Sequence, residues 1–251
     1  MYGSKHSRLR HNLTIRNSIE QPIVLHHGFT SNLEAWLQFG YVQALSRDYQ
    51  CILIDARGHG ASDKPHDAAD YTLRRFVGDV VAVLDALQIQ RAHFFGYSMG
   101  GWIGFGMAKY APERIHALLI NGAHPYADRS WGAFRQVDGT DSDAFIASLE
   151  DVVEQHVPPE LRPQVLANDL QALAAAAQER PALNEVQKTM AMPCLLLVGE
   201  ADSRYPAVQE CTHHIAHATL VALPSLNHTS SFTRSDLVLP HVTNFLATLH
   251  S

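Results

Sequence analysis

Cysteine is scarce in this chain of 251 residues, which has three thiols, at positions 51, 194 and 211. An odd, sparse set without a CxxC pair excludes a disulfide framework and favours reduced thiols in a cytoplasmic protein. Cys51 and Cys194 each open an apolar run, so we interpret them as small buried hydrophobic residues. A thiol nucleophile is therefore disfavoured.

Long apolar runs and an excess of basic charge are also missing. No apolar stretch approaches the length of a membrane-spanning helix, so no membrane partner is expected. The formal net charge is −6, and only the amino terminus, with Lys5, Arg8 and Arg10, is locally basic. This distribution disfavours a nucleic-acid partner. No apolar run follows these basic residues, so they do not form a secretory signal as written.

Nucleotide-binding and metal-binding patterns are absent as well. The glycine-rich stretch DARGHG at residues 55–60 lacks the spacing of a phosphate loop, and no GxGxxG opens a helix. His213 and His217 have the i, i+4 spacing of a helical metal pair, but no carboxylate partner or HExxH motif accompanies them. We interpret them as part of a solvated helix face, and we expect neither a cofactor nor a metal.

What the chain does contain is a series of short apolar runs separated by helical patterns. Continuous apolar runs are typical of parallel strands that are covered on both faces. Helical spacing is clear over residues 73–87 and 237–249, where Pro240 is interpreted as a first-turn or kink residue. The alternation predicts an α/β fold with a mostly parallel, doubly wound sheet. The six runs are residues 23–27, 51–55, 92–96, 117–120, 194–199 and 218–224.

The alternation of strand and helix patterns stops between about residues 124 and 190, where no strand pattern occurs. Helix-like pieces cover residues 143–154, the stretch from 161 onward and residues 169–178, with prolines between them. We predict that residues 124–190 form a small helical cap, inserted in a core made of residues 1–123 and 191–251. Ordinary crossover helices are the alternative interpretation.

One serine lies in a special local pattern, the stretch GYSMG at residues 96–100. Ser98 follows an apolar strand and precedes a helix-like segment, and glycines stand two residues away on both sides. A serine on such a sharp strand-to-helix turn exposes its hydroxyl at the carboxyl edge of the sheet. The five-residue pattern is weak alone, but it is specific in this strand–turn–helix context.

A serine nucleophile needs a base that is itself oriented by a carboxylate. Asp202 and His228 each come shortly after a predicted strand, and the order Ser98, Asp202, His228 is that of the α/β-hydrolase triad. Glu200 and Asp128 are the alternative acids. Asn121, near the end of another strand, cannot carry a charge.

Five ordered motifs together resemble the α/β-hydrolase superfamily, in particular its small esterase, perhydrolase and lactonase-like branch. They are HGF at 27–29, DARGHGASDKP at 55–65, GYSMG at 96–100, GEAD at 199–202 and NH at 227–228. The resemblance covers nearly the whole chain and implies the α/β-hydrolase fold. It also implies an oxyanion hole, formed by the backbone N–H groups of Phe29 and Met99.

The resemblance also suggests roles for further residues. His27 would brace the oxyanion turn, and His59 would belong to a structural loop. The side chains of Phe29, Tyr97 and Met99 would line the acyl side of the pocket. The remaining expected pocket residues are Trp131 and Phe134.

The implied function is that of a cofactor-free serine hydrolase, which cleaves small carboxylic esters through an acyl-enzyme on Ser98. The serine disfavours epoxide hydrolases and haloalkane dehalogenases, which use aspartate at this position. Lactonases, including those for acyl-homoserine lactones, are the nearest alternative. Thioesterases, C–C hydrolases and perhydrolases stay open, although Tyr97 and Phe29 depart from the patterns of the last two. A ligand sensor on the same scaffold and a homodimer also stay open.

Overall fold

The computed structural model describes residues 21–177 and 180–249, so Lys5, Arg8, Arg10 and Gln178 lie outside the described residues. Six β-strands correspond to the six apolar runs predicted from the sequence, with boundaries that differ by a few residues. They are β1 (Gln21–His26), β2 (Tyr49–Ile54), β3 (Ala92–Tyr97), β4 (Ile115–Asn121), β5 (Cys194–Gly199) and β6 (Ala218–Leu223).

The strands form one sheet in the order β2-β1-β3-β4-β5-β6, and every neighbouring pair is parallel. All six carboxyl ends therefore lie along the same edge of the sheet. The direction of winding reverses between β1 and β3, and such a switch point opens a crevice at this edge. The loops that follow β1 and β3 accordingly meet where ligands bind in open α/β sheets.

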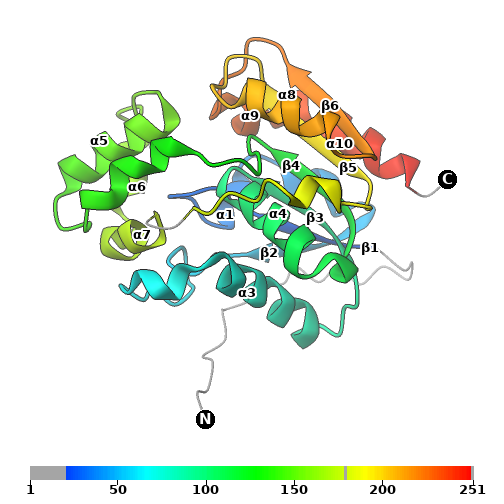
Figure 1. The fold of residues 1–251 in the computed structure, drawn as a ribbon, viewed down its shortest axis with the longest axis horizontal. Coiled ribbons are helices and arrows are strands. Elements are labelled where there is room, and N and C mark those ends of the chain that lie inside the picture. The colour runs from blue at the N-terminus through cyan, green and yellow to red at the C-terminus, as the bar shows by residue number, and fades with distance from the viewer. Residues whose placement is uncertain (1–20, 178–179, 250–251) are drawn as a thin grey trace.

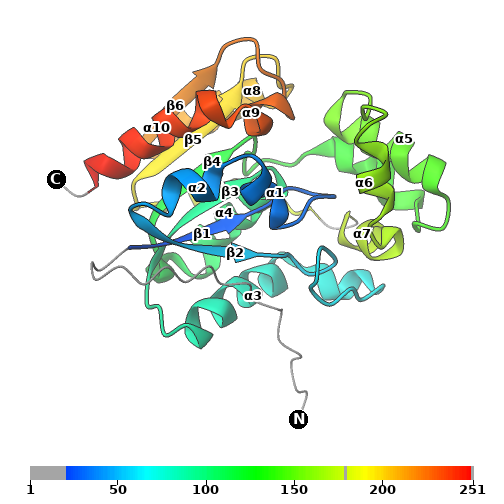
Figure 2. The same cartoon turned by 180° about the vertical axis from the view of Figure 1, so that it is seen from behind.

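Helices cover both faces of the sheet, as Figures 1 and 2 show from opposite sides. Leu118, Leu119 and Ile120 of β4 are successive residues without exposed surface, which is expected of a strand covered on both faces. One face packs against α3 (Leu73–Ala86), α4 (Met99–Tyr110) and α8 (Tyr205–His213). The other packs against α1 (Glu34–Gln38), α2 (Tyr41–Leu45), α9 (Ser230–Thr233) and α10 (Ser235–Thr248). The expected α/β-hydrolase fold is confirmed.

One of the two interpretations of Pro240 is excluded, because this residue lies inside α10 and beyond its first turn, while the kink interpretation stays a prediction. One prediction about a helix face is wrong. The helix α8 ends at His213, and β6 begins at Ala218, so His213 and His217 do not share a helix face. Single-turn η1 (Ala68–Tyr71), η2 (Pro112–Arg114) and η4 (Val186–Lys188) complete the connections between the larger elements.

Four elements between β4 and β5 form a separate group beside the sheet edge, and we call them the outer helices. They are η3 (Arg129–Gln136), α5 (Ser142–Val153), α6 (Arg162–Leu166) and α7 (Leu170–Ala177), coloured green to yellow-green in Figure 1. They enclose an apolar cluster of their own, which includes Phe134, Phe145 and Leu173. No strand occurs among the described residues of this segment, as expected, while its division from the core as a domain stays a prediction.

Polar contacts join the outer helices to the main body. Asn168 Nδ2 donates to the carbonyl oxygen of Thr30, at 3.1 Å, in the loop after β1. His66 Nε2 lies 3.1 Å from the Asp169 carboxylate, at the surface. Within the described part of the chain, no helix is long and apolar enough to cross a membrane.

Candidate active site

Ser98 lies on a tight turn between β3 and α4. Its φ of 52° is in the left-handed region, where a residue other than glycine is strained. The two glycines of the turn have no room for a side chain, because a Cβ on Gly96 would meet the backbone of Gly100, and one on Gly100 would meet the His26 carbonyl. The turn is held because the Ser98 N–H donates to the Asn121 carbonyl oxygen at 2.8 Å.

Three side chains from separate loops form a hydrogen-bonded series at this edge. His228 Nε2 lies 2.9 Å from Ser98 Oγ, and His228 Nδ1 lies 2.7 Å from Asp202 Oδ2. The Asp202 and His228 side chains are almost wholly buried. The series can move a proton from the serine hydroxyl to the imidazole while the carboxylate holds the opposite nitrogen.

The surroundings set the charges of this pair. Burial alone would raise the pKa of Asp202, but the hydrogen bond and charge of His228, together with Arg204, lower it below the ordinary range. Burial, followed by the positive charge of Arg204, lowers the pKa of His228, although Asp202 opposes this. An ionised Asp202 beside a neutral His228 is therefore the resting state at neutral pH.

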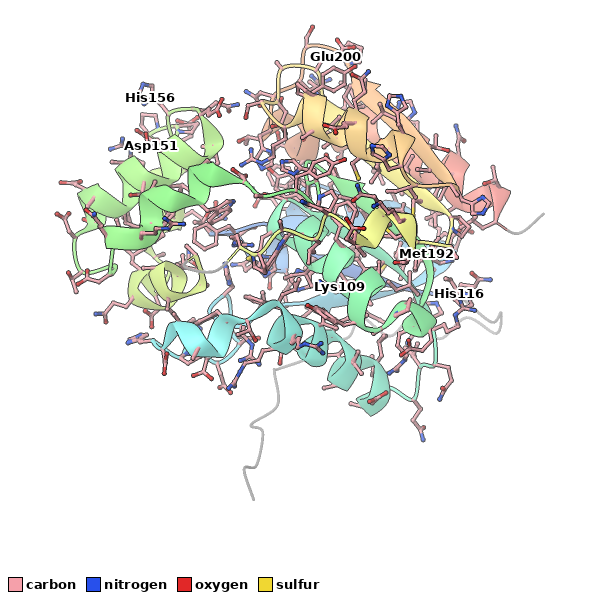
Figure 3. The ribbon with its side chains drawn as sticks, viewed as in Figure 1. Lys109, His116, Asp151, His156, Met192 and Glu200 are labelled. Atoms are coloured by element: carbon pink, nitrogen blue, oxygen red, sulfur yellow. The ribbon has the colours of Figure 1, made fainter. Side chains whose placement is uncertain are left out.

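The other acids considered from the sequence lie elsewhere. Glu200 is exposed, at the position that Figure 3 labels. Asp128 accepts hydrogen bonds from Ser130 and lies 3.5 Å from Arg204 Nη2. Only Asp202, among these carboxylates, contacts the ring of His228.

The loop that carries Phe29 is braced from beneath by His27, which is fully buried. The Ala56 N–H donates to His27 Nε2 at 3.1 Å, so the opposite nitrogen, Nδ1, carries the proton and donates to the Gly28 carbonyl oxygen at 2.8 Å. Burial lowers the pKa of His27, which keeps the ring neutral for this arrangement. His27 therefore fixes the backbone next to Phe29.

Asp55 ties the same loop to the neighbouring one. One carboxylate oxygen accepts the Leu33 N–H and the other accepts the Ala61 N–H, both at 2.8 Å. The loops after β1 and β2 are thus joined through one buried carboxylate. His59, in the second of these loops, is fully buried against Phe29 and His27.

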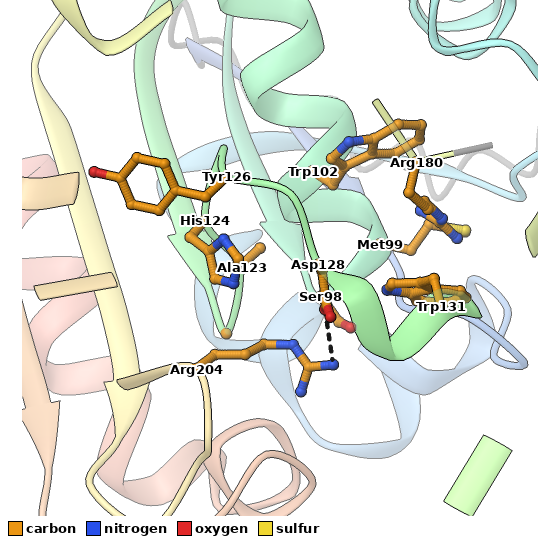
Figure 4. A pocket seen from close by; sticks show the side chains of 11 residues that line it. Ser98, Met99, Trp102, Ala123, His124, Tyr126, Asp128, Trp131, Arg180 and Arg204 are labelled. Atoms are coloured by element: carbon orange, nitrogen blue, oxygen red, sulfur yellow. Dashed lines mark hydrogen bonds and ion pairs between the residues drawn. The ribbon is translucent and has the colours of Figure 1, made fainter. Parts of the chain in front are cut away.

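Ser98 borders two cavities. The larger has a volume of about 390 Å³, mostly apolar walls and contributions from α5 and α6. The smaller, shown in Figure 4, has a volume of about 40 Å³. Ser98, Trp131 and Arg204 border both.

The residues expected to form the pocket do not all reach it. Tyr97 and Phe29 line the larger cavity, Met99 lines the smaller and Trp131 lines both. Phe134 is fully buried and packs against Phe29 and Trp131, so the structure places it behind the wall of these cavities rather than in it.

Two arginines that the sequence analysis did not single out also line the smaller cavity, Arg180 and Arg204. Arg204 comes two residues after Asp202 at the same strand end, and this proximity is a signal that sequence reasoning could have used. Arg180 follows α7 in a proline-containing stretch, and its position depends on how the outer helices fold back.

Other reactive groups do not converge here. Burial raises the pKa of Cys194 and of Cys211 to about 12, so both are held as neutral thiols. Within residues 21–177 and 180–249, no group of three or more His, Cys, Asp or Glu side chains is arranged to hold a metal ion.

Comparisons with known proteins agree with this architecture. The model of the family described as "alpha/beta hydrolase fold" matches residues 21–188. The 3-oxoadipate enol-lactonase 2 of Acinetobacter baylyi is 29% identical over 221 residues, 80% of this chain and 79% of that protein.

Two solved structures are similar over nearly the whole chain. A hydrolase from Pseudomonas aeruginosa has a TM-score of 0.77 and 28% identity, covering 95% of this chain and 92% of its own. The enol-lactonase from Burkholderia xenovorans has a TM-score of 0.78 and 26% identity, covering 96% of each chain.

Proposed function

Because the chain belongs to the alpha/beta hydrolase fold family, we propose that it is a serine hydrolase that cleaves small carboxylic esters without a cofactor. Ser98, His228 and Asp202 act as its catalytic triad. The observation that carries the proposal is the series from Ser98 Oγ through His228 to Asp202, with separations of 2.9 and 2.7 Å.

The reaction follows from the charges of these groups. Neutral His228 takes the proton of Ser98 as Oγ attacks the ester carbonyl, and Asp202 stabilises the imidazolium that forms. The imidazolium then protonates the departing alcohol, which leaves an acyl group on Ser98. His228 next activates a water molecule, and this water releases the acid and restores the serine.

The oxyanion of the tetrahedral intermediate needs donors that are already in place. We assign this role to the backbone N–H groups of Met99 and Phe29. Met99 begins α4, where backbone N–H groups lack helical acceptors. Phe29 follows the Gly28 carbonyl that His27 anchors, which supports a fixed position for this part of the loop.

The larger cavity suits an apolar acyl or alcohol group. Leu149 and Val152 of α5, with Phe29 and Trp131, line it close to Ser98. In this proposal the outer helices act as the cap over the catalytic edge, and α5 limits the length of the chain that fits.

Lactones are the second candidate substrate class. Two of the similar proteins are enol-lactonases. The triad would open a lactone by the same steps, except that the leaving alcohol stays attached to the acyl group. Measuring hydrolysis of aliphatic esters and lactones of matched size distinguishes the two classes.

The test is a comparison of Ser98→Ala with Ser46→Ala, which removes an exposed hydroxyl. We expect Ser98→Ala to fold normally and to lose at least about 10⁴-fold in kcat/KM, since a triad member is removed. Ser46→Ala should keep full activity. A fluorophosphonate should label the wild type but not Ser98→Ala.

Two outcomes would contradict the proposal. Substantial turnover by pure Ser98→Ala would remove this serine from the mechanism. Stoichiometric labelling of Ser98, without turnover of any ester, lactone or thioester, would instead indicate a ligand sensor on the hydrolase scaffold.

A further inference from the structure

The smaller cavity contains a cationic side chain, Arg180, that has no ion-pair partner among the described residues. Arg180 lines this cavity together with Ser98, and its Nε and Nη2 atoms are buried from solvent. Neither atom has a hydrogen-bond acceptor among the residues that the structure describes. A buried donor of a charged group without a partner is costly, so its retention calls for an explanation.

Aromatic rings hold the guanidinium by its faces. Its carbon, Cζ, lies 4.0 Å from the centre of the Trp131 ring and 4.5 Å from that of Trp102, as Figure 4 illustrates. Contacts of this kind stabilise the cation but do not use its N–H groups. The two rings therefore hold Arg180 at the wall of the cavity while its Nε and Nη2 donors stay without an acceptor in the described structure.

Within residues 21–177 and 180–249, no carboxylate takes up these donors. Asp128 is the acid whose charge acts on Arg180, but its Oδ1 accepts from Ser130, and its Oδ2 faces Arg204. Asp202 is paired with His228. Burial, only partly offset by Asp128, lowers the pKa of Arg180 to about 9, as expected of a cation without a close anion.

Further groups around the cavity favour an anion. Arg204 lines it as a second cation, and its Nη1 is buried without a hydrogen bond in the described structure, although it lies 3.5 Å from Asp202 Oδ1. The Nδ1 atom of His124 is also buried without a hydrogen-bond partner there. Among the described residues, Asp128 is the one acidic side chain that lines this cavity.

We propose that the smaller cavity is a carboxylate subsite, and that the preferred substrate is an ester or lactone carrying a free carboxylate close to the reacting carbonyl. Arg180 binds that carboxylate, with the larger apolar cavity holding the rest of the molecule. The inference rests on the proposed hydrolysis at Ser98 and names its substrate class.

The size of the cavity limits the distance between the two groups. A cavity needs a volume of about 10–15 Å³ to hold a single water molecule. The volume of about 40 Å³ therefore accommodates a carboxylate together with a few carbon atoms. In the reaction, water adds across the ester bond, the ester carbonyl becomes a second carboxylate and the alcohol departs, while the bound carboxylate is unchanged.

The experiment compares acidic and neutral esters of nearly equal shape. Monomethyl glutarate is paired with dimethyl glutarate, which tests a carboxylate on the acyl side. Butyryloxyacetate is paired with its methyl ester, which tests one on the alcohol side. We expect the wild type to prefer the acidic member of at least one pair by about tenfold or more, as a charged hydrogen bond provides.

The arginine is tested by Arg180→Gln, with Arg135→Gln as the matched control. Arg135 is an exposed arginine of the outer helices, so its substitution removes the same charge away from the cavity. We expect Arg180→Gln to lower kcat/KM for the acidic ester by about 10- to 100-fold and to leave the neutral ester within about threefold. Arg180→Lys should recover part of the loss, and Arg135→Gln should change neither substrate.

An inhibition measurement adds a result that does not depend on turnover of the acidic ester, and a variant that still hydrolyses the neutral ester is shown to be folded. Free glutarate should inhibit the wild type competitively towards a neutral ester, and Arg180→Gln should abolish this inhibition.

Equal rates on both members of each pair, together with no inhibition by glutarate, would overturn the carboxylate subsite while leaving the hydrolase proposal intact. Undiminished hydrolysis by Ser98→Ala would instead overturn the hydrolase proposal itself.

Discussion

His228 has to be neutral to act as a base, and its surroundings decide the pH range in which the ring is neutral. The ring is buried, stacked on Tyr97 and close to the cation of Arg204, and both burial and this charge disfavour the imidazolium. Asp202 favours the imidazolium, but the net effect is a pKa of His228 below the ordinary value of 6.5. The base is thus available in mildly acidic solution, where a free histidine is already protonated.

We expect kcat/KM to fall with decreasing pH, with a midpoint below about 6.5, because protonation of His228 removes the base. Arg204→Gln removes a charge that lowers this pKa, so the midpoint should move to higher pH. Arg75→Gln, which removes a half-exposed cation paired with Asp70, serves as the control. pH–rate profiles of the three proteins provide the measurement, and identical midpoints would contradict this account of the base.

The identity of the acid in the triad is tested by single substitutions of the three candidate carboxylates. Asp202→Asn keeps the shape of the side chain but favours the wrong tautomer of His228, and we expect a loss of about 10⁴-fold in kcat/KM. Glu200→Gln and Asp128→Asn should each cost less than about tenfold, because neither carboxylate contacts the ring. A severe loss in Asp128→Asn with a mild one in Asp202→Asn would show that the acid is misassigned.

The helix α5 contributes to both the wall of the larger cavity and the apolar cluster of the outer helices. Leu149 and Val152 line the cavity, and they belong to this cluster together with Phe145 and Ile146. Asp141 begins the helix by accepting the N–H groups of Asp143 and Ala144. The cavity wall is therefore a regular element with a fixed start.

Leu149→Phe adds volume to this wall, so we expect a shift in preference towards shorter acyl chains. Hydrolysis of p-nitrophenyl octanoate should fall by about tenfold or more, while that of the acetate stays within about twofold. The matched control is Ala147→Phe, which adds bulk on an exposed position of the same helix. An unchanged preference across an acyl series would show that α5 does not contact the substrate.

The whole molecule is built around three apolar clusters. Two lie on opposite faces of the sheet, and the third belongs to the outer helices. Phe29 is packed against both the third cluster and that of one sheet face. Because the outer helices carry their own cluster and few polar contacts to the sheet, we predict that they can lose order separately from it.

Phe145→Ala removes a fully buried ring from the third cluster and should destabilise it by about 3–5 kcal/mol. We expect faster amide hydrogen exchange over residues 142–177, with β1, β3 and β4 still protected. Exchange measured by mass spectrometry checks this. A uniform loss of protection across the sheet would show instead that the molecule unfolds as one unit.

The sequence contained most of the information about the sheet, because strands buried on both faces appear as continuous apolar runs. The positions of Ser98, Asp202 and His228 could also be anticipated, since each follows a strand and parallel strands end at one edge. Phe134 and Arg180 could not be placed. Their surroundings depend on how short helices fold back onto the loop of Phe29, and no local periodicity encodes that packing.

Arg204 connects the acid of the site to the outer helices. Its backbone N–H and side chain contact Asp202, and its Nη2 donates to the Val152 carbonyl oxygen, at the end of α5, at 2.9 Å. The same side chain therefore contacts both the acid of the His228–Asp202 pair and the end of α5. If this contact makes the pKa of His228 depend on the packing of α5, thermodynamic reciprocity requires that protonation of His228 changes the packing equilibrium of α5 by the same factor. The pH profile of the base would then report how the outer helices pack against the site.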